Sequence, residues 1–214
     1  TLEGAGWVRK GLEDNRYRNS FKIKGMLKGL DNTDRLAEIA APYLDIICQN
    51  TSWPSDLTVL NSSGTFMELK ETSRSTTPFL VNRDKIGHLI NLPLSAVGRT
   101  YLAYCDHSER ELILERLRKT KDPVNKIINQ KETFLDSLRK IRRIGFATRD
   151  ASFGGGRNPL RSKFDDGLNA LAVPIISKNK ILGCISLVWI KKAATVDEIA
   201  DKFLADLQIS SKAI

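Results

Sequence analysis

The sequence predicts an α+β domain in which an antiparallel sheet is flanked by helices. Two segments have the pattern of β-hairpins, because strand-like apolar stretches lie on both sides of short polar turns at residues 63–64 and 177–180. Around them lie segments with apolar residues three and four positions apart, the spacing that places them on one face of an α-helix. Hairpins packed against helices define the α+β class.

The first segment, GWVRKGLEDNRYRNSFKIK, predicts a two-stranded ribbon around a polar turn at residues 13–15. Basic residues lie on both arms, and such a ribbon is typical of a wing that lays Arg and Lys along DNA phosphates. The predicted phosphate contacts are Arg9, Lys10, Arg16 and Arg18.

Residues 33–51 have helical spacing, and Pro42 must either kink this helix or open a second segment. DLTVLNSS and TFMELKET then predict the first hairpin, whereas residues 79–94 fit no single element. At the junction of helix and hairpin, the stretch SWPSDLTVL contains Trp53, a bulky residue with one N–H donor. Trp53 can face the protein's own core or a ligand, and the sequence leaves both readings open.

The second half begins with a short helix over residues 95–105, followed by a helix with a capping box at residues 108–111. Pro123 opens a long amphipathic helix, which Gly145 ends. GLNALAVPII and KILGCISLVWI predict the second hairpin, and Thr195 begins a capping box before the last helix.

The chain of 214 residues has a net charge of +9 and a pI of about 9.5, which favours anionic partners. No segment approaches the ~20 consecutive apolar residues of a membrane helix, and no leader pattern is present, so we expect a cytoplasmic protein without a membrane partner. Cys48, Cys105 and Cys184 have neither disulfide nor zinc-ligand spacing, and we expect three reduced, buried thiols.

Enzyme signatures are sparse. SFGGGRNPLRSK could expose backbone N–H groups to a phosphate, but it lacks the spacings of a P-loop or a dinucleotide fold. His88 and His107 lie in no nucleophile or metal motif, and a turn explains the acid pair at residues 165–166. We therefore predict no catalytic residue, metal or cofactor. An enzyme that uses the loop 152–167 as a phosphate or cofactor site remains the alternative.

The order of elements resembles IclR-type transcriptional regulators. The wing, AAPYLDII, PLSAVGRTYLAYC, RKIRRIGFATRD, LNALAVPII and ILGCISLVWI carry the resemblance, which covers essentially the whole chain. It implies an N-terminal winged helix-turn-helix that binds DNA and a C-terminal GAF-like domain that binds a small organic effector. WPSDLTV and SLVWI most resemble the branch that includes the activator of 3-hydroxyphenylpropionate catabolism, whose members sense aromatic acids.

On this resemblance, residues 1–24 are the remnant of the winged helix-turn-helix, with TLEGAGWV as the end of the recognition helix and the first wing strand. Residues 25–50 are the linker and first helix, and residues 51–214 are the GAF-like effector-binding domain. The base-reading helices would precede residue 1, so this chain is not expected to bind operator DNA specifically. Members of the family form dimers and tetramers, which implies a homo-oligomer that contacts its copies through the apolar side of the linker helix.

The resemblance also places the effector against the concave face of the sheet, over the short helix and beside the last strands. The predicted effector contacts are Trp53, Ser95, Ala96, Val97, Arg149, Leu168, Ala170, Ser186 and Val188. Several family members have polar residues or an acid where this chain has Val188 and Arg149, and this difference favours a larger ligand with a ring. Plainer roles stay open: Ser95 as a helix N-cap, the apolar residues as core and Arg149 as a solvated side chain.

The leading hypothesis is therefore a DNA-binding regulator of catabolic genes that senses a small aromatic acid. Besides the enzyme, one further alternative is a sequence-blind nucleic-acid-binding domain driven by charge alone. That alternative predicts binding with a steep salt dependence and favours a pocket filled by the protein's own side chains.

Overall fold

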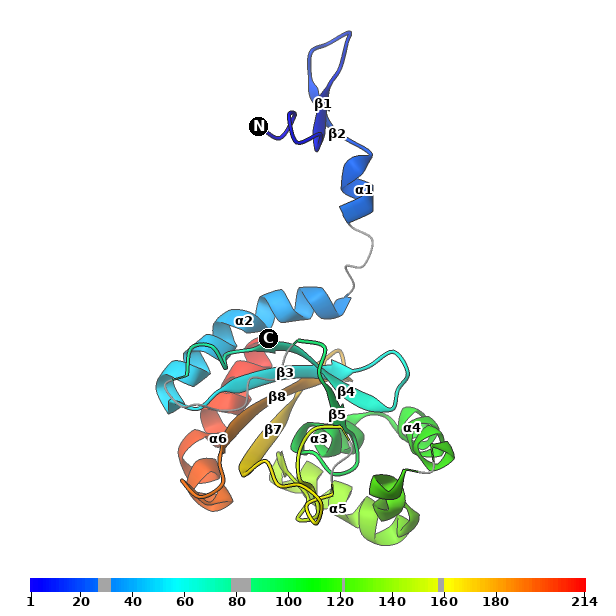
Figure 1. The fold of residues 1–214 in the computed structure, drawn as a ribbon, viewed down its shortest axis with the longest axis vertical. Coiled ribbons are helices and arrows are strands. Elements are labelled where there is room, and N and C mark those ends of the chain that lie inside the picture. Colours follow the sequence, from blue (N-terminus) through cyan, green and yellow to red (C-terminus); the bar gives the residue numbers. More distant parts are fainter. Residues whose placement is uncertain (27–31, 78–85, 121, 158–159) are drawn as a thin grey trace. The chain divides into compact units, whose positions relative to one another are not determined.

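The computed structural model describes residues 1–26, 32–77, 86–120, 122–157 and 160–214 (Figure 1). Parts of the predicted linker (27–31), of the ambiguous segment (79–85) and of the glycine-rich loop (158–159) lie outside the described residues. The chain divides into two compact units, residues 1–35 and residues 36–214.

The first unit contains the predicted ribbon. Strands β1 (Val8–Lys10) and β2 (Tyr17–Asn19) pair antiparallel, and Arg9 lies directly opposite Arg18. Residues 2–6 form turns, and a short helix α1 (Lys22–Met26) follows the ribbon. The ribbon forms as predicted because Asn15 adopts the left-handed conformation (φ 54°) that its tight turn requires.

The second unit is built on one six-stranded antiparallel sheet with the strand order β5-β4-β3-β8-β7-β6. The strands are β3 (Ser55–Leu60), β4 (Phe66–Thr72), β5 (Leu89–Asn91), β6 (Ala147–Thr148), β7 (Leu168–Ser177) and β8 (Lys180–Ile190). Both predicted hairpins are present. The second turns at Lys178 and Asn179, whose φ values of 49° and 62° are those of a tight two-residue hairpin turn.

Helices cover both faces of this sheet (Figure 1). Helices α2 (Asn32–Thr51) and α6 (Val196–Ala213) contribute to the core on one face. The core on the other face includes α3 (Ala96–Tyr104), α4 (His107–Lys119), the 3-10 helix η1 (Pro123–Asn129) and α5 (Lys131–Ile144). The α+β prediction is therefore confirmed, with a separate apolar core on each side of the sheet.

Two details of the helix prediction are wrong. The long helix that begins at Pro123 is two elements, because Gln130 (φ −82°, ψ 65°) leaves the helical conformation between η1 and α5. The N-cap of α4 is Asp106, whose carboxylate accepts a hydrogen bond from the Glu109 N–H at 2.7 Å, whereas Ser108 lies inside the helix. Pro42 lies inside the single helix α2 and opens no second segment.

Other helix ends agree with the prediction. Gly145 adopts φ 86° and ends α5, and Thr195 with Glu198 forms the complete capping box of α6. All three cysteines are free and buried, and burial raises the pKa of the Cys184 thiol well above its usual value. None of the helices in the described part of the chain is long and apolar enough to cross a membrane.

The two-residue alternation along β8 assigns its side chains to the two cores. Ile185, Leu187 and Trp189 belong to the core with α2 and α6. Cys184 and Val188 belong to the core with α3 and α5. From Cys184 to Val188, every second residue of β8 therefore lies on the side of α3, the short helix that was predicted beside the effector.

Substitution of Gly98 by alanine should destabilise the second unit, although alanine ordinarily stabilises a helix interior by about 1 kcal/mol relative to glycine. A Cβ at Gly98 would lie 2.1 Å from the backbone oxygen of Leu92, so α3 would have to move away from β5, at a cost of about 1–3 kcal/mol. Urea unfolding of Gly98→Ala measures this. Gly25→Ala in α1 is the control, because nothing lies within 4 Å of its Cβ position. A Gly98→Ala chain as stable as the control would contradict the close approach.

Candidate functional site

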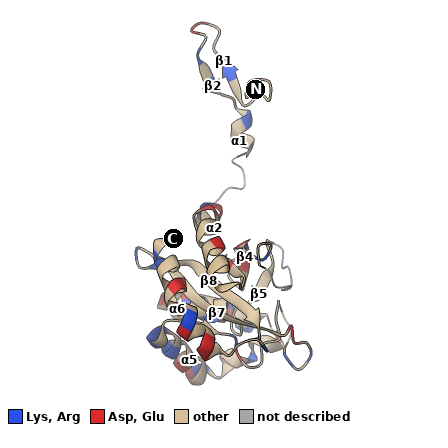
Figure 2. Ribbon diagram, turned by 90° about the vertical axis from the view of Figure 1, so that its left-hand side faces the viewer, with Lys and Arg blue, Asp and Glu red and all other residues tan. Residues whose placement is uncertain are grey.

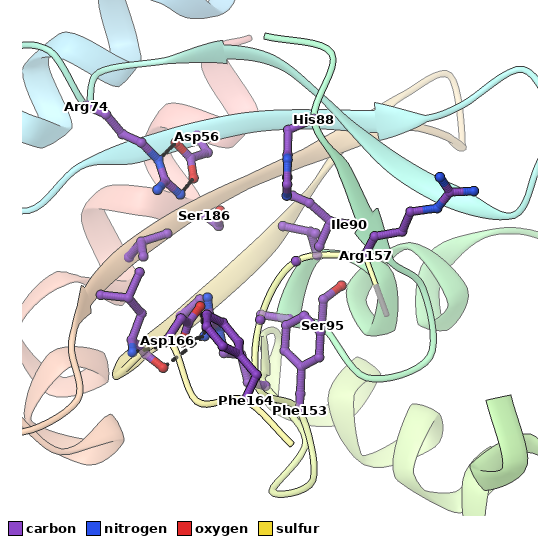
Figure 3. A pocket seen from close by; sticks show the side chains of 18 residues that line it. Asp56, Arg74, His88, Ile90, Ser95, Phe153, Arg157, Phe164, Asp166 and Ser186 are labelled. Carbon is purple, nitrogen blue, oxygen red and sulfur yellow. Dashed lines mark hydrogen bonds and ion pairs between the residues drawn. The ribbon is translucent and has the colours of Figure 1, made fainter. Parts of the chain in front are cut away.

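A cavity of about 310 Å³ opens on the α3 side of the sheet (Figure 3). Its walls come from the sheet, the N-terminus of α3 and the loop 150–167, and its volume lies at the lower end of the range for small-molecule sites. The residues that line it are Asp56, Arg74, His88, Ile90, Ser95, Ala96, Val97, Arg149, Phe153, Gly155, Gly156, Arg157, Phe164, Asp166, Leu168, Ala170, Ser186 and Val188.

The structure brings eight of the nine predicted effector contacts together around this cavity: Ser95, Ala96, Val97, Arg149, Leu168, Ala170, Ser186 and Val188. They meet because β7 and β8 pair with Ala170 opposite Val188. Side chains alternate between the two faces of a strand, so both of these side chains lie on the face toward α3. The open cavity also differs from the filled pocket that the charge-only alternative favours.

Trp53 is the exception, and its interpretation as an effector contact is wrong. It is 9% exposed and packs in the opposite core, with residues of α2 and α6. The reason is strand parity: Trp53 and Leu57 face α2, whereas Asp56 faces the cavity. The residue of SWPSDLTVL that reaches the cavity is therefore the acid, and Trp53 has the plainer role of core residue.

Ser95 has the capping role that the sequence left open. Its Oγ accepts a hydrogen bond from the Gly98 N–H at 3.0 Å and donates to the Asn91 carbonyl. The hydroxyl proton of Ser95 is therefore already used in a hydrogen bond within the protein. The cap fixes the N-terminus of α3 at the cavity wall, where Ala96 and Val97 are the first helical residues and their N–H groups have no acceptor within the helix.

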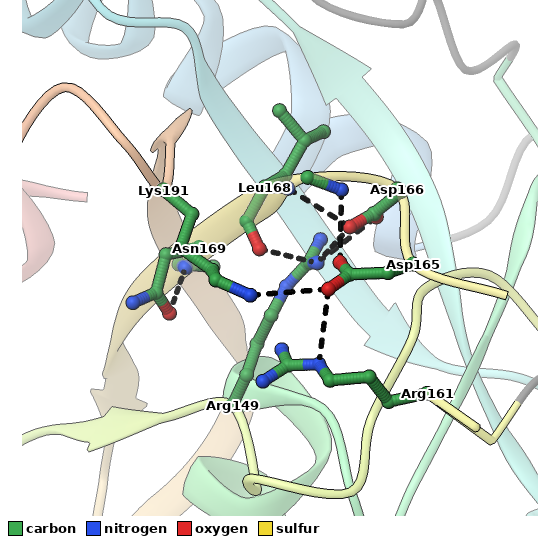
Figure 4. A network of polar contacts seen from close by, with 9 residues as sticks. Arg149, Arg161, Asp165, Asp166, Leu168, Asn169 and Lys191 are labelled. Atoms are coloured by element: carbon green, nitrogen blue, oxygen red, sulfur yellow. Dashed lines mark hydrogen bonds and ion pairs between the residues drawn. The ribbon is translucent and has the colours of Figure 1, made fainter.

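Arg149 is not a solvated side chain. Its Nη1 donates to both carboxylate oxygens of Asp166, at 2.7 and 2.9 Å, and to the carbonyl of Leu168 at 2.9 Å. Its guanidinium also lies over the ring of Phe153, 5.3 Å from the centroid. This partly buried pair (Figure 4) joins Arg149 to Asp166 and to the start of β7.

The adjacent acid, Asp165, has a different role, so the interpretation of residues 165–166 as a plain turn is incomplete. The Gly167 N–H donates to its carboxylate at 2.9 Å, and this bond, together with the nearby ammonium of Lys191, lowers the pKa of Asp165. Asp165 ties the loop to the residue after β8 (Figure 4), while its neighbour Asp166 faces the cavity.

A second ion pair at the cavity wall was missed from the sequence. Arg74 donates to Asp56 through Nε at 3.1 Å and through Nη2 at 2.6 Å, and the Thr72 hydroxyl donates to the same carboxylate at 2.6 Å. The side chains of Asp56 and Arg74 are only 3% and 5% exposed. The available signal was a charged residue within a predicted strand, DLTVL.

Ser186 lies opposite Asp56 in the β3–β8 pairing. The residue is 3% exposed, and its hydroxyl has no hydrogen-bond partner within the described parts of the chain. Ser186 lines the cavity, so its hydroxyl is available to a molecule there.

The glycine-rich loop forms a wall of the cavity. Gly154 packs so closely that a Cβ there would lie 1.9 Å from the Phe164 carbonyl oxygen, and Gly155 has a φ of 121°. The loop brings Phe153 and Phe164 to the cavity, a role that its glycine content alone did not indicate. No group of three His, Cys, Asp or Glu that could hold a metal occurs among the described residues.

The fold and the cavity define a ligand-binding α+β domain. The family model described as "Bacterial transcriptional regulator IclR C-terminal" matches residues 28–214. The chain therefore belongs to the IclR family of bacterial transcriptional regulators, and it is a regulator and not an enzyme.

Solved structures with the same fold come from several bacteria. The IclR of Thermotoga maritima is 19% identical with a TM-score of 0.63, over 99% of this chain and 79% of that chain. An IclR homolog from Microbacterium hydrocarbonoxydans, determined with 4-hydroxybenzoate, is 18% identical with a TM-score of 0.63, over 99% of this chain and 79% of that chain. The inducer-binding domain of PobR from Acinetobacter, determined as a double mutant with 3-hydroxybenzoic acid, is 17% identical with a TM-score of 0.63, over 82% of this chain and 94% of that chain. At these identities the likeness shows the fold alone.

Truncation of Arg74 should destabilise the second unit strongly. Arg74→Ala leaves the carboxylate of Asp56 buried without its counter-ion, which costs about 3–5 kcal/mol. Chemical denaturation measures the loss. The matched change Lys70→Ala removes a partly exposed pair with Glu68 on the same strand and should cost below about 1 kcal/mol. Equal losses in both variants would contradict a structural role for the buried pair.

Proposed function

We propose that the cavity binds a small aromatic carboxylic acid and that this binding controls transcription of catabolic genes. The observation that supports this most directly is the combination of flat apolar walls with fixed charges in a cavity of about 310 Å³. The two related proteins determined with hydroxybenzoates support the same ligand class.

The apolar walls suit a ring. Val97, Ala170 and Val188 form a wall of small side chains from α3 and the sheet, while the loop contributes Phe153 and Phe164. A ring between aliphatic and aromatic surfaces is removed from water on both faces, and aromatic pairs gain additional stabilisation in offset or edge-to-face geometry.

The charged groups suit a single carboxylate. Among the described residues, three arginines and two aspartates line the cavity, and together they carry one net positive charge that one anion would balance. The first N–H groups of α3 point to the same space, and a helix N-terminus favours a negative group. We propose that the carboxylate lies at the N-terminus of α3.

We propose that the basic ribbon contacts DNA phosphates through Arg9, Lys10, Arg16 and Arg18 (Figure 2). Arg18 is partly committed elsewhere, because it forms an ion pair with Asp14 at 2.6 Å, and this pair lowers the pKa of Asp14. Arg9 and Lys10 have no such partner within the described residues. They are therefore the stronger candidates for phosphate contacts.

We propose that the protein is a homo-oligomer. Ile39 and Ile46 lie seven residues apart on α2 and are 40% and 50% exposed, so they share one outward helix face. A second copy of this chain would cover them.

The first prediction for the cavity concerns thermal stability in the presence of aromatic acids. A ligand at 100 times its Kd stabilises the folded state by about 2.7 kcal/mol, which corresponds to a rise in Tm of about 5–10 °C for a domain of this size. Scanning fluorimetry with benzoate, the three hydroxybenzoates, phenylpropionate, pyruvate and glyoxylate measures this shift.

The Ala170→Leu variant, which places a larger side chain in the cavity, should lose the shift. Ala193→Leu, an exposed position after β8, is the matched control and should keep it. Shifts that survive Ala170→Leu would place the ligand elsewhere, and the absence of a shift with every compound would contradict the aromatic-acid proposal.

The second prediction concerns DNA. Arg9→Gln with Lys10→Gln should reduce the slope of log K against log salt for duplex DNA by about 0.9 for each phosphate that the variant no longer neutralises. Lys131→Gln with Lys140→Gln on α5 removes the same charge from the second unit and should leave the slope nearly unchanged. Fluorescence anisotropy over a salt series measures both. Equal reductions would favour binding by net charge alone.

A further inference from the structure

We propose that the end of the cavity formed by Asp56, Arg74 and Ser186 recognises a hydroxyl group of the ligand. The ligand class would then be hydroxylated aromatic acids, which bind in preference to acids with an unsubstituted or alkylated ring. This inference rests on the proposed function and adds to it the substituent that the cavity selects.

The carboxylate of Asp56 is held as a fixed acceptor. One oxygen, Oδ1, accepts hydrogen bonds from the Thr72 hydroxyl at 2.6 Å and from Arg74 Nε at 3.1 Å. The other, Oδ2, accepts from Arg74 Nη2 at 2.6 Å. Because a carboxylate oxygen has room for two donors, Oδ2 keeps capacity for one more, and Asp56 lines the cavity.

The Asp56 side chain is 3% exposed, and its carboxylate lies against the guanidinium of Arg74. A buried carboxylate without such a counter-ion would be costly. With the counter-ion in place, Asp56 accepts hydrogen bonds and donates none. The group that it recognises must therefore bring its own proton.

Ser186 supplies the complementary group. It lies opposite Asp56 across the β3–β8 pairing, and Figure 3 shows the two side chains next to each other at one end of the cavity. Its hydroxyl lies at the cavity wall and has no hydrogen-bond partner among the described residues. A phenolic hydroxyl donates one proton and accepts others, so it can donate to Asp56 while it accepts from Ser186.

The other charged end of the cavity lacks this combination. Both oxygens of Asp166 take hydrogen bonds from Arg149, and Oδ1 also accepts from the Leu168 N–H at 3.0 Å. The nearest hydroxyl on α3, that of Ser95, already donates to the Asn91 carbonyl. The hydroxyl-recognition site is therefore assigned to Asp56 and not to Asp166.

Three kinds of ligand are disfavoured at this end of the cavity, each for a separate reason. A ring without a substituent leaves the remaining acceptor position of Asp56 Oδ2 and the Ser186 hydroxyl unused. A methoxy group places an oxygen lone pair against the carboxylate and has no proton to give. A second carboxylate on the ligand would meet the negative charge of Asp56. A site built to bond a hydroxyl rejects analogues that lack it more strongly than an apolar site rejects a change of size.

The test is a series of Kd values for the native chain, measured by isothermal titration calorimetry with benzoate, the 2-, 3- and 4-hydroxybenzoates and the matching methoxybenzoates. At least one hydroxybenzoate should bind about tenfold or more tightly than benzoate and than its own methyl ether. Equal Kd values for hydroxyl, methoxy and unsubstituted rings would overturn the inference while the proposed function stands. No binding by any of them would overturn the proposed function itself.

Variants test which charged end of the cavity produces the preference for a hydroxyl over a methoxy group. Ser186→Ala should reduce the ratio of the methoxy Kd to the hydroxyl Kd, and Asp56→Asn with Arg74→Gln, which removes both buried charges together, should reduce it further. Asp166→Asn should weaken both ligands by a similar factor and leave the ratio high. A ratio lost in Asp166→Asn but kept in the Asp56 variant would overturn the assignment. Because Asp56→Asn alone removes the carboxylate that faces the buried Arg74 guanidinium and can unfold the chain, the double change is the informative one.

Discussion

Both faces of the six-stranded sheet are buried, and the two-residue alternation along β8 determines what each face carries. Ile185, Leu187 and Trp189 fill the core with α2 and α6, while Cys184, Ser186 and Val188 face α3. One face is closed by large side chains. On the other face the small side chains of the strands and the loop-borne aromatic residues leave space for a ligand. A shift of register by one residue would exchange the two sets and remove the cavity.

Four charged side chains of the cavity form two ion pairs at separate positions on its wall, one buried and one partly buried. Asp56 with Arg74 and Asp166 with Arg149 each satisfy the desolvated groups that they bury. Such pairs add little net stability, but they fix the position and the charge state of acceptors in a dry site. The ligand therefore meets preformed polar groups and spends little free energy on ordering them.

The glycine-rich loop shows how a sequence feature can suggest one chemistry and serve another. Its glycines permit a backbone approach and a φ that side chains would prevent, and the outcome is a wall that carries Phe153 and Phe164. The loop is joined to the start of β7 by Arg149 and to the residue after β8 by Asp165. Its position thus depends on the same hairpin that forms the floor of the cavity.

The sequence alone determined the two hairpins and the cap of α3, because these depend on local spacing: alternation along strands, a serine before a helix, a turn of two polar residues. The eight cavity residues were predicted from the resemblance to IclR-type regulators and not from local spacing. The sequence did not determine which way the SWPSDLTVL stretch faces. Trp53 packs with residues of α2 and α6 and Asp56 lines the cavity, because the side to which each residue of β3 points is set by its pairing with β8, far away in the chain. The partners of the buried acids were also decided only by the tertiary structure, since Asp56 meets Arg74 from the end of β4 and Asp166 meets Arg149 across the loop. Contacts between residues that are distant in sequence leave no periodic signal, and burial of charge becomes visible only when both partners are in place.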